Sequence, residues 1–290
     1  MKKRIRFIIN PISGIGKKNK LPAMIEKYLD HSKFDYDIAF TEYRKHARLL
    51  AKASVDENID IVCAVGGDGS VNEVGSALVN SNSILAIVPA GSGNGLARHL
   101  RLPMSIKKSI LQINALKVET IDTGKLNKHT FLGVTGFGFD ALIAKRFDDY
   151  HTRGFLSYVK LVVKEYIASK PITVIANNTR VENVVICCVA NGSQFGNGFC
   201  VSPNSNIQDG KFELFFLKKF PWYAIPGLMI RFFRCSVDKS KYTKIETCKA
   251  YKIELEQTLV HIDGEPEEVK KELMVSVNPN SLRVIVGEKF

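Results

Sequence analysis

The 290-residue sequence lacks an apolar segment long enough to cross a bilayer. A membrane-spanning helix needs about 20 predominantly apolar residues, whereas the richest stretch, residues 220–233, contains two prolines and Arg231. The N-terminal segment MKKRIRFIIN is basic, but its apolar part is only Phe-Ile-Ile, which is too short for a secretory signal. The sequence therefore excludes a multi-span membrane protein, and any membrane contact is expected to be made from outside.

Cysteine is sparse and follows no motif. The six cysteines include no Cys-x-x-Cys pair, which excludes a zinc ribbon and a thioredoxin-type redox site. Cys63, Cys187 and Cys188 lie inside apolar runs, where a thiol behaves as a small hydrophobic side chain. We therefore expect reduced cysteines and a cytoplasmic protein.

Acidic residues are few relative to basic ones. The chain has 41 lysines and arginines against 29 acidic residues, a formal net charge of +12. Such an excess points to an anionic partner, such as an acidic membrane surface, a phosphorylated ligand or nucleic acid. No recognised nucleic-acid-binding motif is present, so we expect no nucleic-acid partner. The hydrophobic content of 45% excludes a disordered chain and allows one large or two ordinary domains.

Strand and helix patterns alternate over the first 113 residues. Short apolar runs predict buried strands, and the segments between them have apolar residues at helical spacing. The predicted strands cover residues 4–10, 34–42, 59–67 and 83–91, and the predicted helices cover 18–32, 46–58, 70–81, 93–102 and 105–113. This alternation predicts a parallel sheet that is covered by helices on both faces.

Short, closely spaced strands dominate the rest of the chain. They are predicted over residues 119–127, 129–137, 171–177, 183–192, 211–219, 250–256 and 258–265, with helices over 142–169 and 222–235. The spacing indicates an antiparallel sandwich or barrel. We therefore expect an α/β domain over residues 1–120 and a β-rich domain over 121–281, with residues 282–290 as a candidate strand that returns to the first domain.

Three glycine-rich turns follow predicted strands, at residues 10–14, 66–70 and 89–95. Ligands of open α/β sheets bind at the carboxyl ends of the strands, and glycine backbones and helix N-termini suit phosphate groups. The hydroxyls of Ser13, Ser70 and Ser92 can donate to phosphate oxygens. Asp68 can hold Mg²⁺ directly or through water. Together these turns predict a site for a polyphosphate nucleotide.

The motifs NPISG, GGDGSVNE and PAGSGNGLAR resemble those of the diacylglycerol kinase catalytic domain superfamily, which includes bacterial diacylglycerol kinases, sphingosine kinases and ceramide kinases. The resemblance continues through TGFGFDA at 135–141, Asp-Gly-Lys at 209–211 and HIDGEP at 261–266, so it covers nearly the whole chain. It implies an ATP- and Mg²⁺-dependent lipid kinase, with its site in the cleft between an α/β domain and a β-sandwich domain.

The resemblance also implies roles for individual residues. Glu265 matches the general base of bacterial relatives, and Asp140 matches the acidic residue that binds the lipid head group in sphingosine kinases. One Mg²⁺ would be organised by Asp68, and a second would be held by the Asp209 carboxylate with backbone carbonyls at Asn206 and Lys211. The implied ATP site comprises Asn10, Pro11, Ser13, Gly14, Thr41, Gly66, Gly67, Asp68, Gly69, Ser70, Asn72, Glu73, Gly91, Ser92, Gly93 and Asn94.

Two departures from the family pattern leave the acceptor lipid open. Gly95 stands where bacterial diacylglycerol kinases usually have aspartate, and Gln208 precedes Asp209 where they usually have a second aspartate. Diacylglycerol, a sphingoid base, a ceramide or a prenyl alcohol would each satisfy the motifs. A soluble enzyme similar to NAD kinase, and a non-catalytic sensor of lipid or nucleotide, are the alternative functions.

Residues 215–250 combine aromatic and basic side chains. The stretch contains eight lysines and arginines and only two acidic residues, Asp238 and Glu246. It therefore supplies half of the net positive charge of the chain. Aromatic side chains flanked by cations are typical of proteins that dock on an anionic lipid surface. We therefore expect peripheral membrane association through this segment. The sequence does not determine the oligomeric state, and a homodimer is one of the states it allows.

Overall fold

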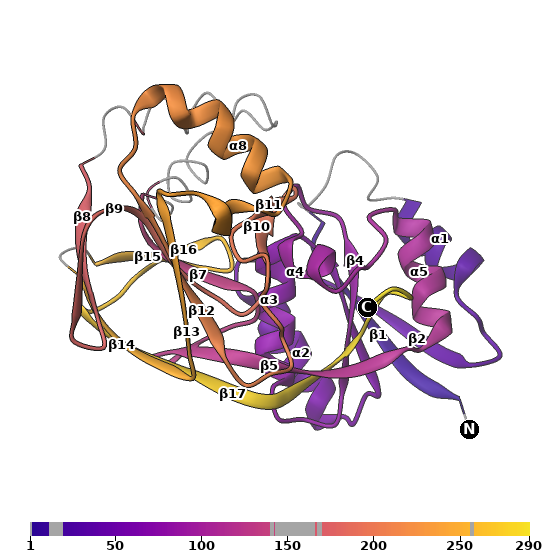
Figure 1. The fold of residues 1–290 in the computed structure, drawn as a ribbon. Coiled ribbons are helices and arrows are strands. Elements are labelled where there is room, and N and C mark those ends of the chain that lie inside the picture. Colours follow the sequence, from indigo (N-terminus) through magenta and orange to yellow (C-terminus); the bar gives the residue numbers. More distant parts are fainter. Residues whose placement is uncertain (1, 12–19, 140–141, 143–165, 167–169, 256–257) are drawn as a thin grey trace. The chain divides into compact units, whose positions relative to one another are not determined.

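The structure is a computed structural model that describes residues 2–11, 20–139, 142, 166, 170–255 and 258–290. The chain divides into two compact units, shown in Figure 1. Unit 1 comprises Met1–Thr123 and Pro279–Phe290, and unit 2 comprises Gly124–Asn278. The helix predicted over 142–169 lies almost entirely outside the described residues.

Unit 1 is built on a parallel sheet. Its strands β1 (Lys3–Ile9), β2 (Phe34–Phe40), β3 (Ile61–Gly66) and β4 (Ile84–Pro89) pair in the order β2-β1-β3-β4. β3 and β4 are buried along their whole length, as expected for parallel strands with both faces covered. The winding direction reverses between β1 and β3, which is where doubly wound sheets bind their ligands.

Helices cover both faces of this sheet. The described helices of unit 1 are α1 (Leu21–Tyr28), α2 (His46–Asp56), α3 (Asp68–Leu78), α4 (Gly95–His99) and α5 (Ile106–Ala115). On one face, Ile25 of α1 and Ile110 of α5 belong to the same buried cluster as Phe7 of β1. α2 and α3 contact each other and pack on β1 and β3, where alternate strand residues such as Ala64 are also buried. This arrangement confirms the expected α/β architecture.

The end of strand β17 (Glu272–Ile285) also belongs to unit 1. Arg283 pairs with Ile84 in a parallel ladder with β4. Val286 is buried, and its carbonyl accepts a hydrogen bond of 2.9 Å from the Gln112 side chain. The sequence predicted a returning strand only over residues 282–290, beyond the tripeptide Asn-Pro-Asn at 278–280, whose composition is typical of a turn. The observed strand continues through that tripeptide.

Unit 2 is an antiparallel β structure. Its strands are β6 (His129–Phe131), β7 (Val134–Gly138), β8 (Ile172–Ala176), β9 (Thr179–Ala190), β10 (Gln194–Gly196), β11 (Phe199–Cys200), β12 (Phe212–Lys218), β13 (Thr243–Cys248), β14 (Ala250–Leu255), β15 (Leu259–Ile262) and β16 (Glu265–Glu268), together with the last three residues of β5 (Val118–Leu126) and the first part of β17. The main path runs β16-β15-β7-β9-β8-β14-β17, and β12 pairs with both β9 and β13. β10, β11, β13 and β16 were not predicted, since each is short or polar.

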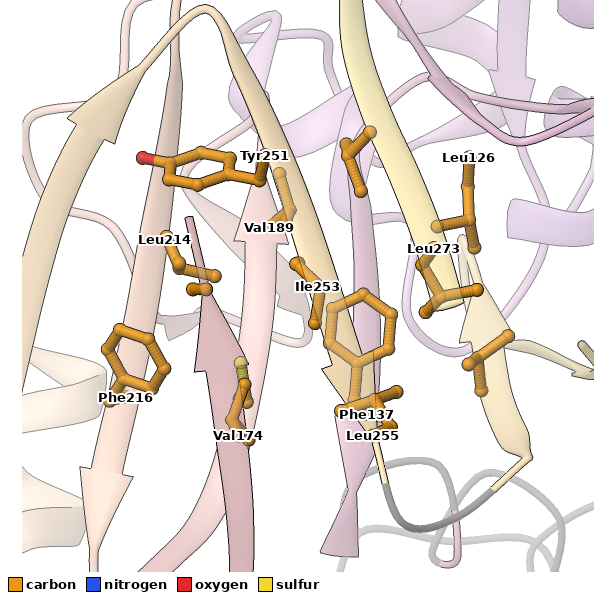
Figure 2. Packing of buried hydrophobic residues seen from close by; sticks show 14 of the residues in the cluster. Leu126, Phe137, Val174, Val189, Leu214, Phe216, Tyr251, Ile253, Leu255 and Leu273 are labelled. Atoms are coloured by element: carbon orange, nitrogen blue, oxygen red, sulfur yellow. The ribbon is translucent and has the colours of Figure 1, made fainter. Parts of the chain in front are cut away.

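Strand β12 divides the core of unit 2 into two clusters. Leu214 and Phe216 point into one cluster, while Phe215 and Leu217 point into the other, as the two-residue period of a strand requires. Figure 2 shows the first cluster, in which side chains from β7, β8, β9, β12, β14 and β17 meet. The five apolar residues of β12, which lie on both of its faces, are all buried.

The helix α8 (Ile225–Phe233) covers the second cluster and follows a short 3-10 turn, η2 (Trp222–Ala224). Leu228 and Phe232 of α8 are buried in this cluster, whereas Ile230 and Phe233 are exposed. α8 thus packs on the sheet with one face and leaves apolar side chains on its outer surface. Across the described part of the chain, no helix is both long and apolar enough to cross a membrane.

One cysteine pair departs from the expectation of reduced thiols. Cys200, buried in β11, forms a disulfide with Cys235, which follows α8. The rings of Phe199 and Phe232 stack beside the pair, with centroids 4.0 Å apart. The two cysteines are 35 residues apart in the sequence, so no local motif indicates their proximity. Cys63, Cys187, Cys188 and Cys248 are free, and the first three are buried as expected.

The imidazole of His99 makes the stability of unit 1 depend on pH. Burial, assisted by the nearby Arg101 charge, lowers the pKa of His99 from 6.5 to about 4. The unfolded chain binds a proton at the ordinary pKa, so protons favour unfolding as the pH falls from about 6.5 to about 4. We expect the free energy of unfolding to decrease by up to about 3 kcal/mol over this window. Urea denaturation at several pH values checks this, and the variant His99→Gln should lose most of the dependence. An equal pH dependence in both proteins contradicts the assignment.

Candidate functional site

Three turns of unit 1 meet at one edge of the parallel sheet. The strand register aligns the last residues of β1, β3 and β4, so the segments that follow them begin side by side. The N–H of Asn10 donates to the carbonyl of Val65 at 3.1 Å. The N–H of Ala90 donates to the carbonyl of Gly66 at 2.8 Å. The glycine-rich segments that start after these strands therefore lie at the carboxyl end of the sheet.

The second and third turns touch each other through glycines. A Cβ atom at Gly91 would lie 2.4 Å from the Cα of Gly67, and a Cβ at Gly67 would lie 3.3 Å from the Cα of Gly91. The first distance is too short for any side chain, so the turns can pack this closely only with glycine at position 91. Backbone without side chains is also what a phosphate group needs for close approach.

Replacing Gly91 with alanine should force these two turns apart. We expect the free energy of unfolding to fall by about 1–3 kcal/mol. The ATP binding that the resemblance implies should weaken, because the N–H groups of both turns move. Urea denaturation and titration with ATP measure the two effects. Gly227→Ala is the matched control, since Gly227 lies in α8 and a Cβ there would have no atom within 4 Å. Equal ATP affinity in Gly91→Ala and the wild type would contradict the prediction.

Asp68 holds the third turn in shape. α3 begins at Asp68, two residues earlier than predicted, so this carboxylate lies in the first helical turn, where the helix dipole stabilises it. Its Oδ2 accepts the N–H of Asn94 at 2.8 Å and its Oδ1 accepts the N–H of Gly95 at 2.7 Å. Asn94 has a left-handed φ of 54° and bonds Gly91 twice, as acceptor at 3.1 Å and as donor at 2.8 Å. One carboxylate therefore connects two of the turns.

The first turn is joined to the second through side chains. Nδ2 of Asn10 donates to Oγ of Ser70 at 3.3 Å. On the following helical turn, Oε1 of Glu73 accepts the N–H of Lys45 at 3.0 Å, which fastens α3 to the loop before α2. These contacts give Asn10 and Glu73 structural roles in addition to those implied by the resemblance.

The other residues expected at the nucleotide site fall into three groups: Thr41, residues outside the described part of the chain, and residues at the sheet edge or in α3. Thr41 is buried directly after β2, and its N–H donates to the carbonyl of Ile9 at 2.9 Å. Ser13, Gly14 and the lipid-site candidate Asp140 lie outside the described residues. The remaining members, at the same sheet edge or in the first turns of α3, are Pro11, Gly66, Gly69, Asn72, Ser92 and Gly93.

The donor set of these turns fits a Mg²⁺ ion held mainly by phosphate oxygens and water. Each oxygen of the Asp68 carboxylate accepts one backbone N–H and keeps further acceptor capacity. Mg²⁺ in kinases usually retains several waters and contacts few protein carboxylates. Among the described residues, no group of three or more His, Cys, Asp and Glu side chains could hold a metal ion by itself.

In unit 2, Glu265 follows a tight hairpin turn between β15 and β16. The turn residues Asp263 and Gly264 both have positive φ, 47° and 88°, which is the type I′ geometry that Asp-Gly sequences favour. Ile262 pairs with Glu265 across the turn. Glu265 is partly buried at the first position of β16. Its backbone position is therefore defined by the turn.

The carboxylate of Asp263 fixes this hairpin to the segment before β7. It accepts the N–H groups of Leu132 at 2.8 Å, Gly133 at 2.8 Å and Val134 at 3.0 Å. The N–H of Asp263 donates in turn to the carbonyl of Val134 at 2.9 Å. Sequence reasoning missed this positioning residue, because an Asp-Gly pair indicates only a turn.

His261 anchors the other strand of the hairpin. It is buried, and its Nδ1 accepts the N–H of Gly264 at 3.3 Å. The Thr135 hydroxyl donates to the His261 carbonyl at 2.7 Å. The His261 ring also contacts the edge of Phe195, with centroids 5.4 Å apart. The hairpin that carries Glu265 is thus held by hydrogen bonds from residues 132–135 and by a ring contact with Phe195.

The expected second metal site lies in an exposed loop between β11 and β12. Oδ1 of Asp209 accepts the N–H of Lys211 at 3.0 Å, and Oδ1 of Asn206 accepts the N–H of Gln208 at 3.0 Å. Burial, and secondarily the charges of Asp209 and Asp238, raises the pKa of Glu213 at the start of β12. Asp209 supplies the one carboxylate among the three expected ligands.

Two family profiles match the chain. The profile described as the diacylglycerol kinase catalytic domain matches residues 4–126. The profile described as the YegS C-terminal NAD kinase beta sandwich-like domain matches residues 133–286. Together the two profiles cover both units, in the order found along the chain.

Curated relatives carry the name diacylglycerol kinase. One from Staphylococcus saprophyticus is 36% identical over 141 residues, which are 48% of this chain and 46% of the relative. One from Mycobacterium tuberculosis is 27% identical over 222 residues, 73% of this chain and 72% of the relative. The matched region thus spans about half the length of the staphylococcal relatives.

Solved structures share the fold over the full length. A diacylglycerol kinase from Bacillus anthracis str. Sterne superimposes with a TM-score of 0.73 at 20% identity, covering 99% of this chain and 98% of that chain. Two further structures from the same bacterium reach a TM-score of 0.78 with the same coverage. At this identity the likeness establishes the two-domain fold.

Proposed function

The chain belongs to the diacylglycerol kinase superfamily, and on that premise we propose that it transfers the γ-phosphoryl group of ATP to a hydroxyl group of a membrane lipid. The observation that carries this proposal is the glycine contact between the second and third turns, with Asp68 bonded across it. It supports phosphate binding because the two glycines have no side chain that would keep a phosphate group away from the backbone beside the N-terminus of α3.

ATP is assigned to the turns that follow β1, β3 and β4 and to Thr41. In this assignment, N–H groups of the glycine turns and the hydroxyls of Ser70 and Ser92 donate to phosphate oxygens. Asp68 would hold Mg²⁺ directly or through water. When bound, the ion would neutralise negative charge on the phosphate oxygens, and the Asp209 loop is the proposed place for a second, more weakly held ion. Positioning and charge neutralisation are the main needs of phosphoryl transfer.

Glu265 is proposed as the general base. Its carboxylate accepts the proton of the lipid hydroxyl while the hydroxyl oxygen bonds to the γ-phosphorus. The bond from that phosphorus to the bridging oxygen breaks, and ADP leaves with the bonding electrons. The hairpin network of Asp263 and His261 supports this role, because a base must lie within about 3 Å of the proton it takes. Asp140 is assigned to the lipid head group.

Membrane docking is assigned to residues 215–250, and we place the protein in the cytoplasm at the membrane surface. Trp222 and Tyr223 are 74% and 69% exposed, and Ile230 and Phe233 lie on the outer face of α8. Basic residues surround these side chains in the sequence. Exposed aromatic side chains with nearby cations suit the interface of an anionic membrane.

The deciding experiment is transfer of labelled γ-phosphate from ATP to lipids in mixed micelles with Mg²⁺. The acceptors are diacylglycerol, monoacylglycerol, sphingosine, ceramide and undecaprenol, with NAD as the soluble control. Labelling of a lipid that is abolished when EDTA removes Mg²⁺ supports the proposal and identifies the acceptor. Labelled NAD alone would assign the chain to a soluble kinase, and bound ATP without any product would indicate a sensor.

A further inference from the structure

Two adjoining hollows lie where β9, β12 and β13 pair. One has a volume of about 450 Å³ and is lined by Arg180, Val181, Glu182, Asn183, Lys218 and Lys244. The other has a volume of about 530 Å³ and is lined by Asn183, Lys218, Lys219, Phe220 and Pro221. Because Asn183 and Lys218 line both, they form one depression, here named the Lys218 hollow. None of its residues has a role in the proposed phosphoryl transfer.

The Lys218 hollow results from an irregular ladder between β9 and β12. The register shifts between Leu217 and Lys218, so that Lys218 lies opposite Val184. Asn183 adopts a left-handed φ of 58°, and its carbonyl accepts the N–H of Lys219 at 2.7 Å. This bulge ends the regular pairing at the two lysines and opens the surface beside them.

The Lys218 hollow carries positive charge that the protein does not neutralise. Arg180 and Lys244 each form an ion pair with an acidic neighbour on their own strand. Within the described residues, neither Lys218 nor Lys219 forms an ion pair. An unpaired ammonium group at an open hollow is a suitable point-charge ligand for a phosphate group.

An apolar surface continues directly from this charge. Phe220 and Pro221 line the hollow, and Trp222 and Tyr223 follow them in η2, largely exposed. The indole and phenol groups have an apolar body and a polar edge, which is why they accumulate at the boundary between lipid and water. The surface therefore offers cations for a phosphate and aromatic rings for the adjoining interface.

We propose that the Lys218 hollow binds the phosphate-bearing head group of an anionic phospholipid while Trp222 and Tyr223 enter the membrane interface. The inference rests on the proposed function, since it specifies how a lipid kinase is held at the membrane. It goes further by assigning a head-group site to β9 and β12, including Arg180 and Asn183, which lie outside the basic and aromatic stretch identified from the sequence. The bound phospholipid anchors the protein and is not the phosphoryl acceptor.

Trp222 is the only tryptophan in the chain, so its fluorescence reports on this surface alone. The full-length protein is titrated with vesicles of phosphatidylcholine, with and without phosphatidylglycerol. We expect a blue shift of the emission with the anionic vesicles only. Lys218→Gln/Lys219→Gln should raise the half-saturating lipid concentration roughly 30-fold, since each basic residue near the surface contributes a factor of about five to six. Lys218→Arg/Lys219→Arg should retain binding.

The matched control is Lys270→Gln/Lys271→Gln, which removes the same charge from exposed positions of unit 2. An equal loss in this control, or no loss in Lys218→Gln/Lys219→Gln, would overturn the inference. Release of the wild type by inorganic phosphate at the concentration of the lipid would overturn it too, by assigning the hollow to a soluble anion. Circular dichroism confirms that each variant is folded.

The micelle assay separates this inference from the proposed function. Vesicle binding that depends on Lys218 and Lys219, without phosphorylation of any lipid, would refute the kinase proposal and support the head-group site. If a lipid is phosphorylated but vesicle binding does not depend on Lys218 and Lys219, the kinase proposal is supported and the head-group site is refuted.

Discussion

Glu265→Gln should lower the turnover number on the true lipid acceptor by about 10²–10⁴-fold, the usual contribution of a general base. Glutamine has nearly the same shape but cannot take up the proton of the hydroxyl group. The Asp263–Gly264 turn and the ladder to β15 involve backbone at this position, so the fold of the hairpin should persist. We expect ATP affinity to stay nearly unchanged. Initial rates with saturating ATP and lipid, together with an ATP titration, measure both quantities.

Glu268→Gln is the matched control for this variant. Glu268 lies on the same strand, is exposed, and has the same charge. It should retain the wild-type turnover number. Wild-type turnover in Glu265→Gln would disprove the assignment of the base, and an equal loss in Glu268→Gln would show that strand β16 is sensitive to charge in general.

Asp68→Asn should reduce kcat/KM for ATP by at least about a hundredfold. The carboxylate accepts two backbone N–H groups, and bonds to a charged acceptor contribute about 1.5–3 kcal/mol each. An asparagine offers one acceptor oxygen, so its amide nitrogen would face a second N–H donor. The third turn should then lose its shape, and the proposed orientation of Mg²⁺ should be lost with it. Initial rates at a series of ATP and Mg²⁺ concentrations test this.

Asp35→Asn serves as the control, since Asp35 is an exposed carboxylate of the same unit that pairs with Lys2. It should leave kcat/KM unchanged. Partial recovery of Asp68→Asn at high Mg²⁺ would identify ion binding as the lost contribution, whereas a loss that Mg²⁺ does not relieve would identify the turn. A folded Asp68→Asn with wild-type kcat/KM would contradict both roles.

Unit 1 could be predicted almost completely because its signals are local. Unbroken apolar runs are sufficient to identify buried parallel strands, and the helices between them have clear apolar faces. The start of α3 was placed too late, because Gly-Asp-Gly has a low intrinsic helix propensity. An acidic residue in the first helical turn compensates for that propensity.

Unit 2 was harder to predict because its irregular parts depend on distant partners. β13 is polar and lies within the basic stretch 215–250, so no apolar pattern indicated a strand there. It nevertheless pairs with β12 along its whole length. The bonds of Asp263 to residues 132–134 cross more than a hundred positions of sequence. The Cys200–Cys235 pair depends on the packing of α8. None of these contacts leaves a periodic or motif-like signal.

The sheet of unit 1 contains residues from two distant parts of the sequence, and this has a consequence for biosynthesis. Until residues 279–290 have been translated, β4 lacks the neighbouring strand residues Arg283 and Val284, which pair with it in the folded protein. At about 5–20 residues per second, translation of unit 2 exposes that strand edge for roughly ten to thirty seconds. An open edge is a template for pairing with other chains. Nascent unit 1 is therefore expected to be most prone to aggregation during this interval, before its final strand arrives.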